Sequence, residues 1–132
     1  MRGARSLVQV LVAASLAMLW VVVARADDPD TDGDGVPDPV DNCLLVSNPG
    51  PGQIDSDQDG YGNRCDGDFN NDGVVDGLDV YIFEQSWELP GVTDHNRDGF
   101  TDGGDYGIFL TLFNDYPGPS GLACAGTIPC LP

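Results

Sequence analysis

Basic side chains are scarce in this sequence, in which five lysines and arginines stand against 22 acidic residues in 132 positions. The resulting net charge of −17 is repelled by a phosphate backbone, so nucleic acid is not expected as a partner. Self-repulsion of this size also keeps a chain expanded unless a cation neutralises it. The charge therefore indicates a protein whose folding depends on bound cations.

A long apolar run occurs only once, at the N-terminus. Arg2 and Arg5 precede an apolar stretch over residues 7–23, and the sequence ARA ends at Ala26. This pattern predicts a secretory signal peptide over residues 1–26, with no membrane span after cleavage. An uncleaved anchor helix is the alternative, because the run lies near the lower edge of a spanning length.

The mature chain is also poor in apolar residues. Removal of residues 1–26 from the 132 leaves 106, with all 22 acidic residues and only Arg64 and Arg97 as basic ones, so the charge becomes −20. About a third of these residues are apolar, which is too few for an ordinary hydrophobic core.

A catalytic constellation is missing too. The single histidine, His95, lies at position 2 of an Asp-rich loop described below, where its side chain is expected to face solvent. Acid–base catalysis needs a carboxyl group with a raised pKa in a dry pocket, and no segment here is expected to enclose one. We therefore do not expect an enzyme.

Four cysteines are present, all of them in the mature part. Export to an oxidising compartment makes disulfides the expected state. Zinc is the alternative, although no histidine or second close cysteine pair completes a ligand set. Four cysteines allow three pairings, and their two local groups favour Cys43 with Cys65 and Cys124 with Cys130.

Four Asp-rich segments of the same kind repeat along the mature chain. They read DTDGDGVPDPVD from Asp30, DSDQDGYGNRCD from Asp55, DFNNDGVVDGLD from Asp68 and DHNRDGFTDGGD from Asp94, and we name them loops 1 to 4. Each has Asp at position 1, Asp or Asn at position 3, Asp at 5, Gly at 6 and Asp at 12. A solvated acidic linker is the alternative interpretation, but a random acidic tract would not repeat this register four times.

The register is typical of a calcium-binding loop. Oxygens at positions 1, 3 and 5 point inward, glycine at 6 permits a sharp turn, a backbone carbonyl serves at 7, and position 12 closes the shell. Calcium is favoured over magnesium because carboxylate-rich loops supply the six to eight oxygens that it takes. Position 12 holds Asp in place of the longer Glu, so the backbone must come closer to the ion. We expect about four Ca²⁺ ions, one for each loop.

Loops 1 and 2, with NPGPGQ between them, resemble a thrombospondin type 3 repeat over residues 30–66. In that family the chain has almost no hydrophobic core and wraps around calcium ions, and one disulfide closes the unit. The resemblance implies a disulfide between Cys43 and Cys65. The ligands that it implies are Asp30, Asp32, Asp34, Asp38, Asp41 and the carbonyl of Val36 for one ion, and Asp55, Asp57, Asp59, Asp66 and the carbonyl of Tyr61 for another.

Two details of this unit carry expectations. Asn63, at position 9 of loop 2, replaces the Asp that is usual in the family, so this site loses a negative charge and is expected to be weaker. The local apolar cluster is expected to pack beneath the disulfide. It consists of Leu44, Leu45, Val46 and Ile54.

Loops 3 and 4 are each followed by a segment with helical spacing. After loop 3 the apolar positions are Val80, Phe83 and Trp87, and a proline at position 90 stops the run. After loop 4, apolar residues fall at i, i+3, i+4 and i+7 of one helix face; they are Tyr106, Phe109, Leu110 and Phe113. The loops start at 68 and 94, an offset of 26 that also relates the two apolar sets. We expect two equivalent short helices that pack face to face.

The segments before loops 3 and 4 are too short or too broken for an entering helix, so each unit is a loop followed by a helix. A tandem pair of such units resembles a dockerin, the module by which bacterial polysaccharide-degrading enzymes attach to cohesin domains. The resemblance implies two further calcium sites and a cohesin-like partner. The implied ligands are Asp68, Asn70, Asp72, Asp76, Asp79 and the carbonyl of Val74, and Asp94, Asn96, Asp98, Asp102, Asp105 and the carbonyl of Phe100.

The partner face departs from the dockerin pattern. In that family the residues just after position 9 choose the cohesin, and basic residues further along the helix assist. The first helix here carries Glu84 and Glu88 without a lysine. The residues at the selecting positions are Gly77, Leu78, Gly103 and Gly104.

The sequence thus predicts a small, mostly irregular chain that calcium and disulfides stabilise, with two short α-helices in a dockerin-like pair and no substantial β-sheet. Its expected parts are a signal peptide at 1–26, a thrombospondin type 3-like unit at 27–66, a dockerin-like domain at 67–115 and a Pro/Gly-rich, cysteine-pinned tail at 116–132. We expect a secreted or cell-surface protein of bacterial origin, with a structural or adhesive role toward another extracellular protein. The alternative is a dockerin-type accessory that binds a cohesin and serves polysaccharide degradation.

Overall fold

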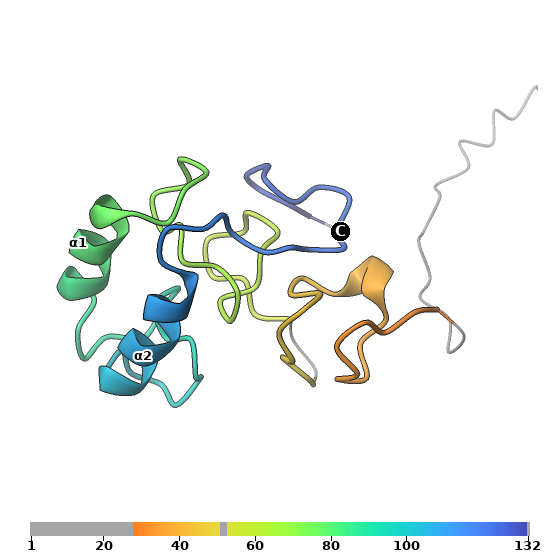
Figure 1. Ribbon diagram of the computed structural model, residues 1–132, viewed down its shortest axis with the longest axis horizontal. Coiled ribbons are helices and arrows are strands. Elements are labelled where there is room, and N and C mark those ends of the chain that lie inside the picture. The colour runs from red at the N-terminus through yellow and green to blue at the C-terminus, as the bar shows by residue number, and fades with distance from the viewer. Residues whose placement is uncertain (1–27, 51–52, 132) are drawn as a thin grey trace, which may run out of the picture.

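The computed structural model describes residues 28–50 and 53–131 (Figure 1). The predicted signal peptide lies outside the described residues. Figure 1 shows the two helices at one end, loop 1 at the other, and the C-terminal segment running back over the middle. No helix in the described part is long and apolar enough to cross a membrane.

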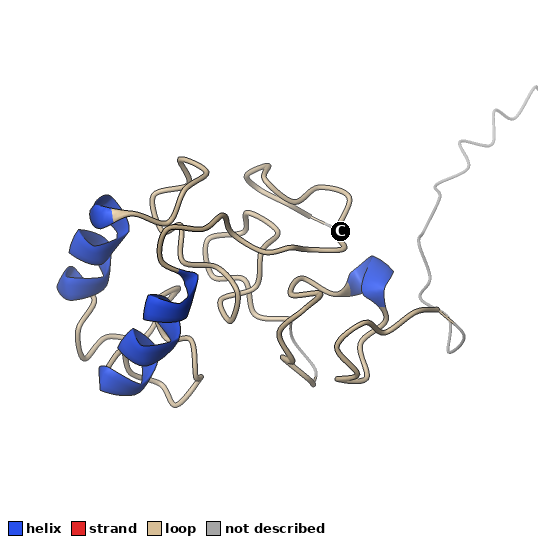
Figure 2. Ribbon diagram, viewed as in Figure 1, coloured by secondary structure: helices blue, strands red, loops and turns tan. Residues whose placement is uncertain are grey.

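Regular structure is sparse, as predicted. The elements are a 3₁₀ helix η1 (Asp38–Val40) and two α-helices, α1 (Gly77–Gln85) and α2 (Gly103–Leu112), and the described residues contain no strand (Figure 2). The disulfides join Cys43 to Cys65, with 5.7 Å between the Cα atoms, and Cys124 to Cys130. The predicted fold class and both predicted cysteine pairings are therefore confirmed.

Both α-helices begin at a residue of the preceding loop. Asp76 and Asp102, at loop position 9, are the N-caps, and their side chains accept hydrogen bonds from the backbone N–H of Leu78 and Gly104. The side chain of the aspartate three residues later in turn accepts a hydrogen bond from the backbone N–H of the cap residue, which completes a capping box. These reciprocal bonds satisfy N–H groups that a helix start leaves free.

The hydrophobic core is a small aromatic cluster between the helices. Phe83 of α1 and Phe109 of α2 are fully buried, with ring centroids 5.4 Å apart. Phe69 and Val75, two residues of loop 3 that the sequence analysis did not assign to a core, complete the buried cluster. Phe69 stacks on Phe109 at 5.5 Å. The helices therefore meet through their aromatic faces, with loop 3 closing one side.

The predicted core faces were too wide. Leu110 is 52% exposed and Trp87 is 48% exposed, although both were expected on the buried side. Successive helical residues are about 100° apart, so once Phe109 points to the partner helix, Leu110 is turned away from it. A helix with one neighbour buries only a narrow stripe.

Loops 3 and 4 each pair with the chain that leaves the other unit's helix. The backbone N–H of Val75 donates to the carbonyl of Asp115 and its carbonyl accepts from Asn114, both at 2.9 Å. At the positions related by the offset of 26, the backbone N–H of Thr101 donates to the carbonyl of Leu89, and its carbonyl accepts from the N–H of Glu88, both also at 2.9 Å. Four backbone hydrogen bonds therefore join the two loop-helix units, and an internal pseudo-twofold axis relates the two pairs of bonds.

The interior of the thrombospondin type 3-like unit is polar. Leu45 and Ile54, which were expected beneath the disulfide, are exposed. The buried side chains beside Cys43 are Asn42 and Asn48, joined by a 2.8 Å bond from the Asn48 side-chain amide to the Asn42 side-chain oxygen. Amide side chains can bond the many backbone groups of an irregular chain, which leucine cannot do.

The core makes a testable prediction. Phe109→Ala should lower the free energy of unfolding by about 3–5 kcal/mol, because it empties the centre of the aromatic cluster. Leu110→Ala is the matched control, since its side chain is half exposed, and should cost less than about 1 kcal/mol. Urea unfolding in saturating calcium measures both, and equal losses would contradict the observed helix orientation.

Candidate calcium-binding loops

The four loops share one backbone conformation. The glycines at position 6 have positive φ values of 94°, 93°, 94° and 101° in loops 1 to 4. The residues at position 4 also have positive φ values, between 58° and 76°, and are Gly33, Gln58, Asn71 and Arg97. Positive φ is uncommon outside glycine. Three of the four residues at position 4 are not glycine and still have it, so the loops share the same backbone turn.

The aspartates at positions 1 and 5 accept the same backbone hydrogen bonds in every loop. The N–H of the glycine at position 6 donates to Oδ2 of the aspartate at position 1, at 3.0, 2.8, 2.7 and 3.0 Å. The N–H at position 7 donates to Oδ1 of the aspartate at position 5, at 2.8, 2.8, 3.1 and 3.1 Å. These bonds hold the carboxylates in a fixed orientation around the loop centre.

Three of the loops bring three carboxylates together. Within the described residues, ligand oxygens lie within 4.8 Å of one another in three groups, which are Asp30, Asp32 and Asp34, then Asp55, Asp57 and Asp59, and then Asp94, Asp98 and Asp105. Loop 3 has no such group, and its position 3 is Asn70. Oxygen-only donor sets of this kind suit calcium.

Several of these carboxylates keep a buried oxygen without any hydrogen-bond partner. They are Oδ2 of Asp32 and Asp41 in loop 1, Oδ1 of Asp57 and Oδ2 of Asp66 in loop 2, and Oδ1 of Asp94 in loop 4. All five belong to predicted ligands: loops 1 and 2 contribute positions 3 and 12, and loop 4 contributes position 1. A buried charged oxygen without a partner is unfavourable, and a bound Ca²⁺ would satisfy it. The residues of these loops therefore fit the ion.

Two carboxylates of loop 2 have strongly raised pKa values. Burial, followed by the charge of Asp59, raises the pKa of Asp66 to about 9. Burial likewise raises the pKa of Asp59 to about 7, and the charges of Asp57, Asp55 and Asp68 add to it. Burial also raises the pKa of Asp32, Asp41, Asp57 and Asp79. Burial disfavours the charged form, and a bound divalent cation reverses that preference.

Position 12 closes loops 3 and 4 against their own backbone. The carboxylates of Asp79 and Asp105 are fully buried. Each accepts a hydrogen bond from the N–H at position 3, at 3.2 and 2.9 Å, and another from the N–H at position 9, at 2.8 Å in both loops. The shorter side chain of Asp is thus matched by a backbone drawn in toward it.

Asn63, whose replacement of an aspartate was expected to weaken the site of loop 2, bonds to other partners. Its side-chain oxygen accepts from the N–H of Ser56 at 2.9 Å, and its amide donates to the Ser56 hydroxyl and to the carbonyl of Gly91, each at 2.9 Å. Gly91 lies just before loop 4. Asn63 therefore links loop 2 to the loop-helix pair, a role that an aspartate without an N–H donor could not fill.

His95 does not face solvent, so this prediction was wrong. Its ring is fully buried between Phe69, at 5.7 Å, and Phe83, at 6.4 Å, and its Nδ1 contacts the backbone oxygen of Asn63. Burial lowers the pKa of His95, which favours the neutral ring. Phe69 occupies the equivalent position 2 of loop 3, so the crossed arrangement turns this position toward the core in both units.

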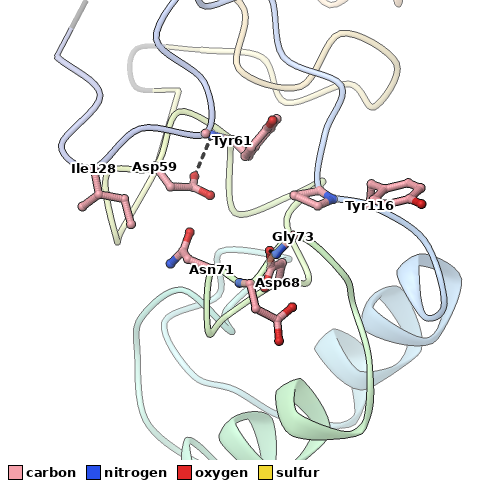
Figure 3. A pocket seen from close by; sticks show the side chains of 10 residues that line it. Asp59, Tyr61, Asp68, Asn71, Gly73, Tyr116 and Ile128 are labelled. Atoms are coloured by element: carbon pink, nitrogen blue, oxygen red, sulfur yellow. Dashed lines mark hydrogen bonds between the residues drawn. The ribbon is translucent and has the colours of Figure 1, made fainter.

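A pocket of about 310 Å³ lies between loop 2, loop 3 and the C-terminal tail. Figure 3 shows Asp59 and Asp68 facing the middle of the pocket, with Tyr61, Tyr116 and Ile128 around them. No pattern in the sequence pointed to this pocket, because its walls come from segments up to about 70 positions apart. Its acidic lining belongs to the ligand sets of loops 2 and 3.

Comparison with known proteins supports the first resemblance. The thrombospondin type 3 repeat family matches residues 26–51 and 54–80. The chain is 56% identical over 67 residues to thrombospondin-3 of Mus musculus, covering 42% of this chain and 7% of that protein. It is 60% identical over 56 residues to cartilage oligomeric matrix protein of Bos taurus, and the match covers 35% of this chain and 7% of that protein. No solved structure matches.

These matches show that the chain contains thrombospondin type 3 repeat sequence. The second of the two segments matched by the family extends through loop 3 to residue 80. The chain spans only about 7% of the length of the curated relatives. Both relatives are animal proteins, and the comparisons support neither a dockerin, a cohesin partner nor a bacterial origin.

The buried charge of loop 2 makes a testable prediction. Asp66→Asn keeps the shape of the side chain and removes a carboxyl that the metal-free fold must protonate at neutral pH, so it should raise the melting temperature in chelator and weaken calcium binding about tenfold or more at one site. Asp115→Asn, an exposed change outside the loops, is the control and should alter neither quantity. A fall in the chelator melting temperature for Asp66→Asn would show that its charge is not a cost to the metal-free chain.

Proposed function

We propose that this protein is a secreted calcium-binding module with a structural or adhesive role outside the cell. The observation that carries the proposal is the repeated loop geometry, in which predicted ligands keep buried oxygens that no protein group satisfies. The thrombospondin type 3 repeat sequence supports it, because chains of that family wrap around calcium ions.

Each loop would hold one ion through positions 1, 3, 5, 9 and 12 and the carbonyl at position 7 of the register. Loop 2 would lack the side chain of Asn63, which is engaged elsewhere. Because these sites need ordered loops, the binding free energy of calcium would be folding free energy. The bound ions would also remove much of the self-repulsion of the acidic chain.

An apolar surface on the helix pair supports a partner. Trp87, Leu89, Phe100, Tyr106 and Leu110 are exposed. Trp87 and Tyr106 both contact Phe83, and Leu89 is bonded to the residue after Phe100. Contiguous exposed apolar groups of this kind are typical of interaction sites.

Two positions of this surface are acidic on the other side of the pseudo-twofold. At the related positions, 26 residues away, Leu89 is replaced by Asp115 and Leu110 by Glu84. The surrounding charges are acidic, among them Glu88 and Asp98. The complementary partner is an extracellular protein with an apolar centre and basic surroundings.

Cohesin docking has less support. The two loop-helix units are arranged as a related pair, but the positions that select a cohesin hold Gly77, Leu78, Gly103 and Gly104, of which only Leu78 presents a side chain. A pull-down with a cohesin panel in calcium and in chelator tests this alternative. Calcium-dependent capture would revive it, and its absence would remove it.

Calcium titration of the chain from residue 27 tests the main proposal. We expect calorimetry to detect about four ions and circular dichroism to show helix in calcium but not in chelator, because the helix caps belong to the loops. Absence of binding at millimolar calcium would identify the chain as an acidic spacer and overturn the proposal.

A further inference from the structure

We infer that the C-terminal tail, residues 117–131, is a positioning element for the calcium sites of loops 1 and 2. The inference rests on the calcium binding proposed above and concerns how the sites are held in shape. The cysteine spacing predicts a tail pinned on itself by its own disulfide. The structure places it against the thrombospondin type 3-like unit instead (Figure 1).

The first part of the tail crosses the unit at the Cys43–Cys65 disulfide. Gly118 donates its backbone N–H to the carbonyl of Cys65 at 3.1 Å, and the N–H of Leu44 donates to the carbonyl of Pro119 at 2.9 Å. Gly121 then donates to the carbonyl of Asp41, the residue at position 12 of loop 1, at 2.8 Å. The tail therefore bonds the chain on both sides of the disulfide.

The second part of the tail reaches the centre of loop 2. The N–H of Gly126 donates to the carbonyl of Asp59, at position 5, at 2.8 Å, and the N–H of Cys130 donates to the carbonyl of Gln58, at position 4, at 2.6 Å. Gln58 has a positive φ of 64°, so these bonds hold the loop at its first sharp turn. The disulfide between Cys124 and Cys130 closes the bend from which both N–H groups point.

The contact is tight enough to require small residues. A Cβ atom added to Gly60 of loop 2 would lie 2.7 Å from both the Ala125 Cα and the Cys130 Sγ, and one added to Gly121 would collide with the carbonyl oxygen of Asp38. One added to Gly118 would lie 2.6 Å from the ring of Tyr61. The tail is thus fitted to loops 1 and 2 at backbone distance.

Loops 3 and 4 provide an internal comparison. Within the described residues the tail makes no hydrogen bond to either of them. Groups that orient metal ligands from outside the first shell typically change metal affinity 10–100-fold when removed. Displacement of the tail should therefore weaken calcium binding at loops 1 and 2 by about tenfold or more and leave loop 4 unchanged.

Gly121→Val tests the inference because the added side chain collides with the backbone oxygen of Asp38. The φ angle of Gly121 is not in the positive range, so the substitution acts through space alone. Gly107→Val is the matched control, since nothing lies within 4 Å of the added Cβ. A chain ending at Tyr116 is the second variant, in case Gly121→Val disturbs folding; circular dichroism in calcium checks that α1 and α2 remain.

Terbium luminescence reports the sites separately. Tyr61 lies at position 7 of loop 2 and can sensitise an ion bound there, and Tyr61→Phe identifies its signal. A Phe100→Trp background gives a corresponding signal from loop 4. We expect both tail variants to bind terbium about tenfold more weakly or worse at the Tyr61-reported site, with no change at the loop 4 reporter or in the Gly107→Val control.

The outcomes separate the two proposals. Equal affinity at the Tyr61-reported site with and without the tail, in a chain that still binds ions, overturns the tail inference alone. An equal loss at both reporters also overturns it, since the tail would then support the whole fold. An unmodified chain that binds neither terbium nor calcium overturns the calcium function together with the tail inference.

Discussion

Carboxylate repulsion, and its relief by a cation, is the constraint on which this structure depends. Asp59 and Asp66 lie in one loop, nearly excluded from water; burial raises the pKa of both, and the charge of Asp59 adds to the effect on Asp66. Among the described residues of the thrombospondin type 3-like unit, the buried side chains are polar or belong to the Cys43–Cys65 disulfide, Asn42 and Asn48 among them, so no apolar cluster there offsets that cost. With calcium bound as proposed, order in this half of the chain would come from coordination and from covalent closure by the disulfide.

The loops combine tasks that most folds assign to separate segments. Position 9 caps a helix in loops 3 and 4, and position 12 completes the capping box while it closes the loop. Position 2 supplies the core with Phe69 and His95, and position 8 bonds the opposite unit. A twelve-residue segment thus builds the helix start, part of the core and the proposed ion site together, which explains how so few apolar residues suffice.

The sequence was informative wherever a feature depends on near neighbours. Glycine at position 6 predicted the sharp turn because the need for positive φ is local, and the spacing of Phe83 and Phe109 predicted the helices. The cysteine pairing followed from proximity along the chain. The assignment of calcium ligands stays a prediction, although their shared geometry and unpaired oxygens agree with it.

Features that depend on distant segments were missed. The burial of His95, the second role of Asn63 and the course of the tail all arise from contacts across 20 or more positions, for example 32 between His95 and Asn63. Periodicity tells which residues share a helix face but not how wide a face the neighbour covers, so Leu110 was misplaced. One available signal was overlooked: the offset of 26 aligns His95 with Phe69, and two rings at the same position indicate an inward side chain.

The crossed bonds at Val75 and Thr101 have a consequence for the pair of loop-helix units. Both residues are fully buried, and buried backbone groups need partners. One loop-helix unit alone offers its position 8 nothing to bond, because the matching carbonyl and N–H belong to the other unit. In a solitary unit these groups would lie open to water, and burying them would require a second copy around a twofold axis. The tandem arrangement supplies both units in one polypeptide, so these backbone groups find their partners without association between chains.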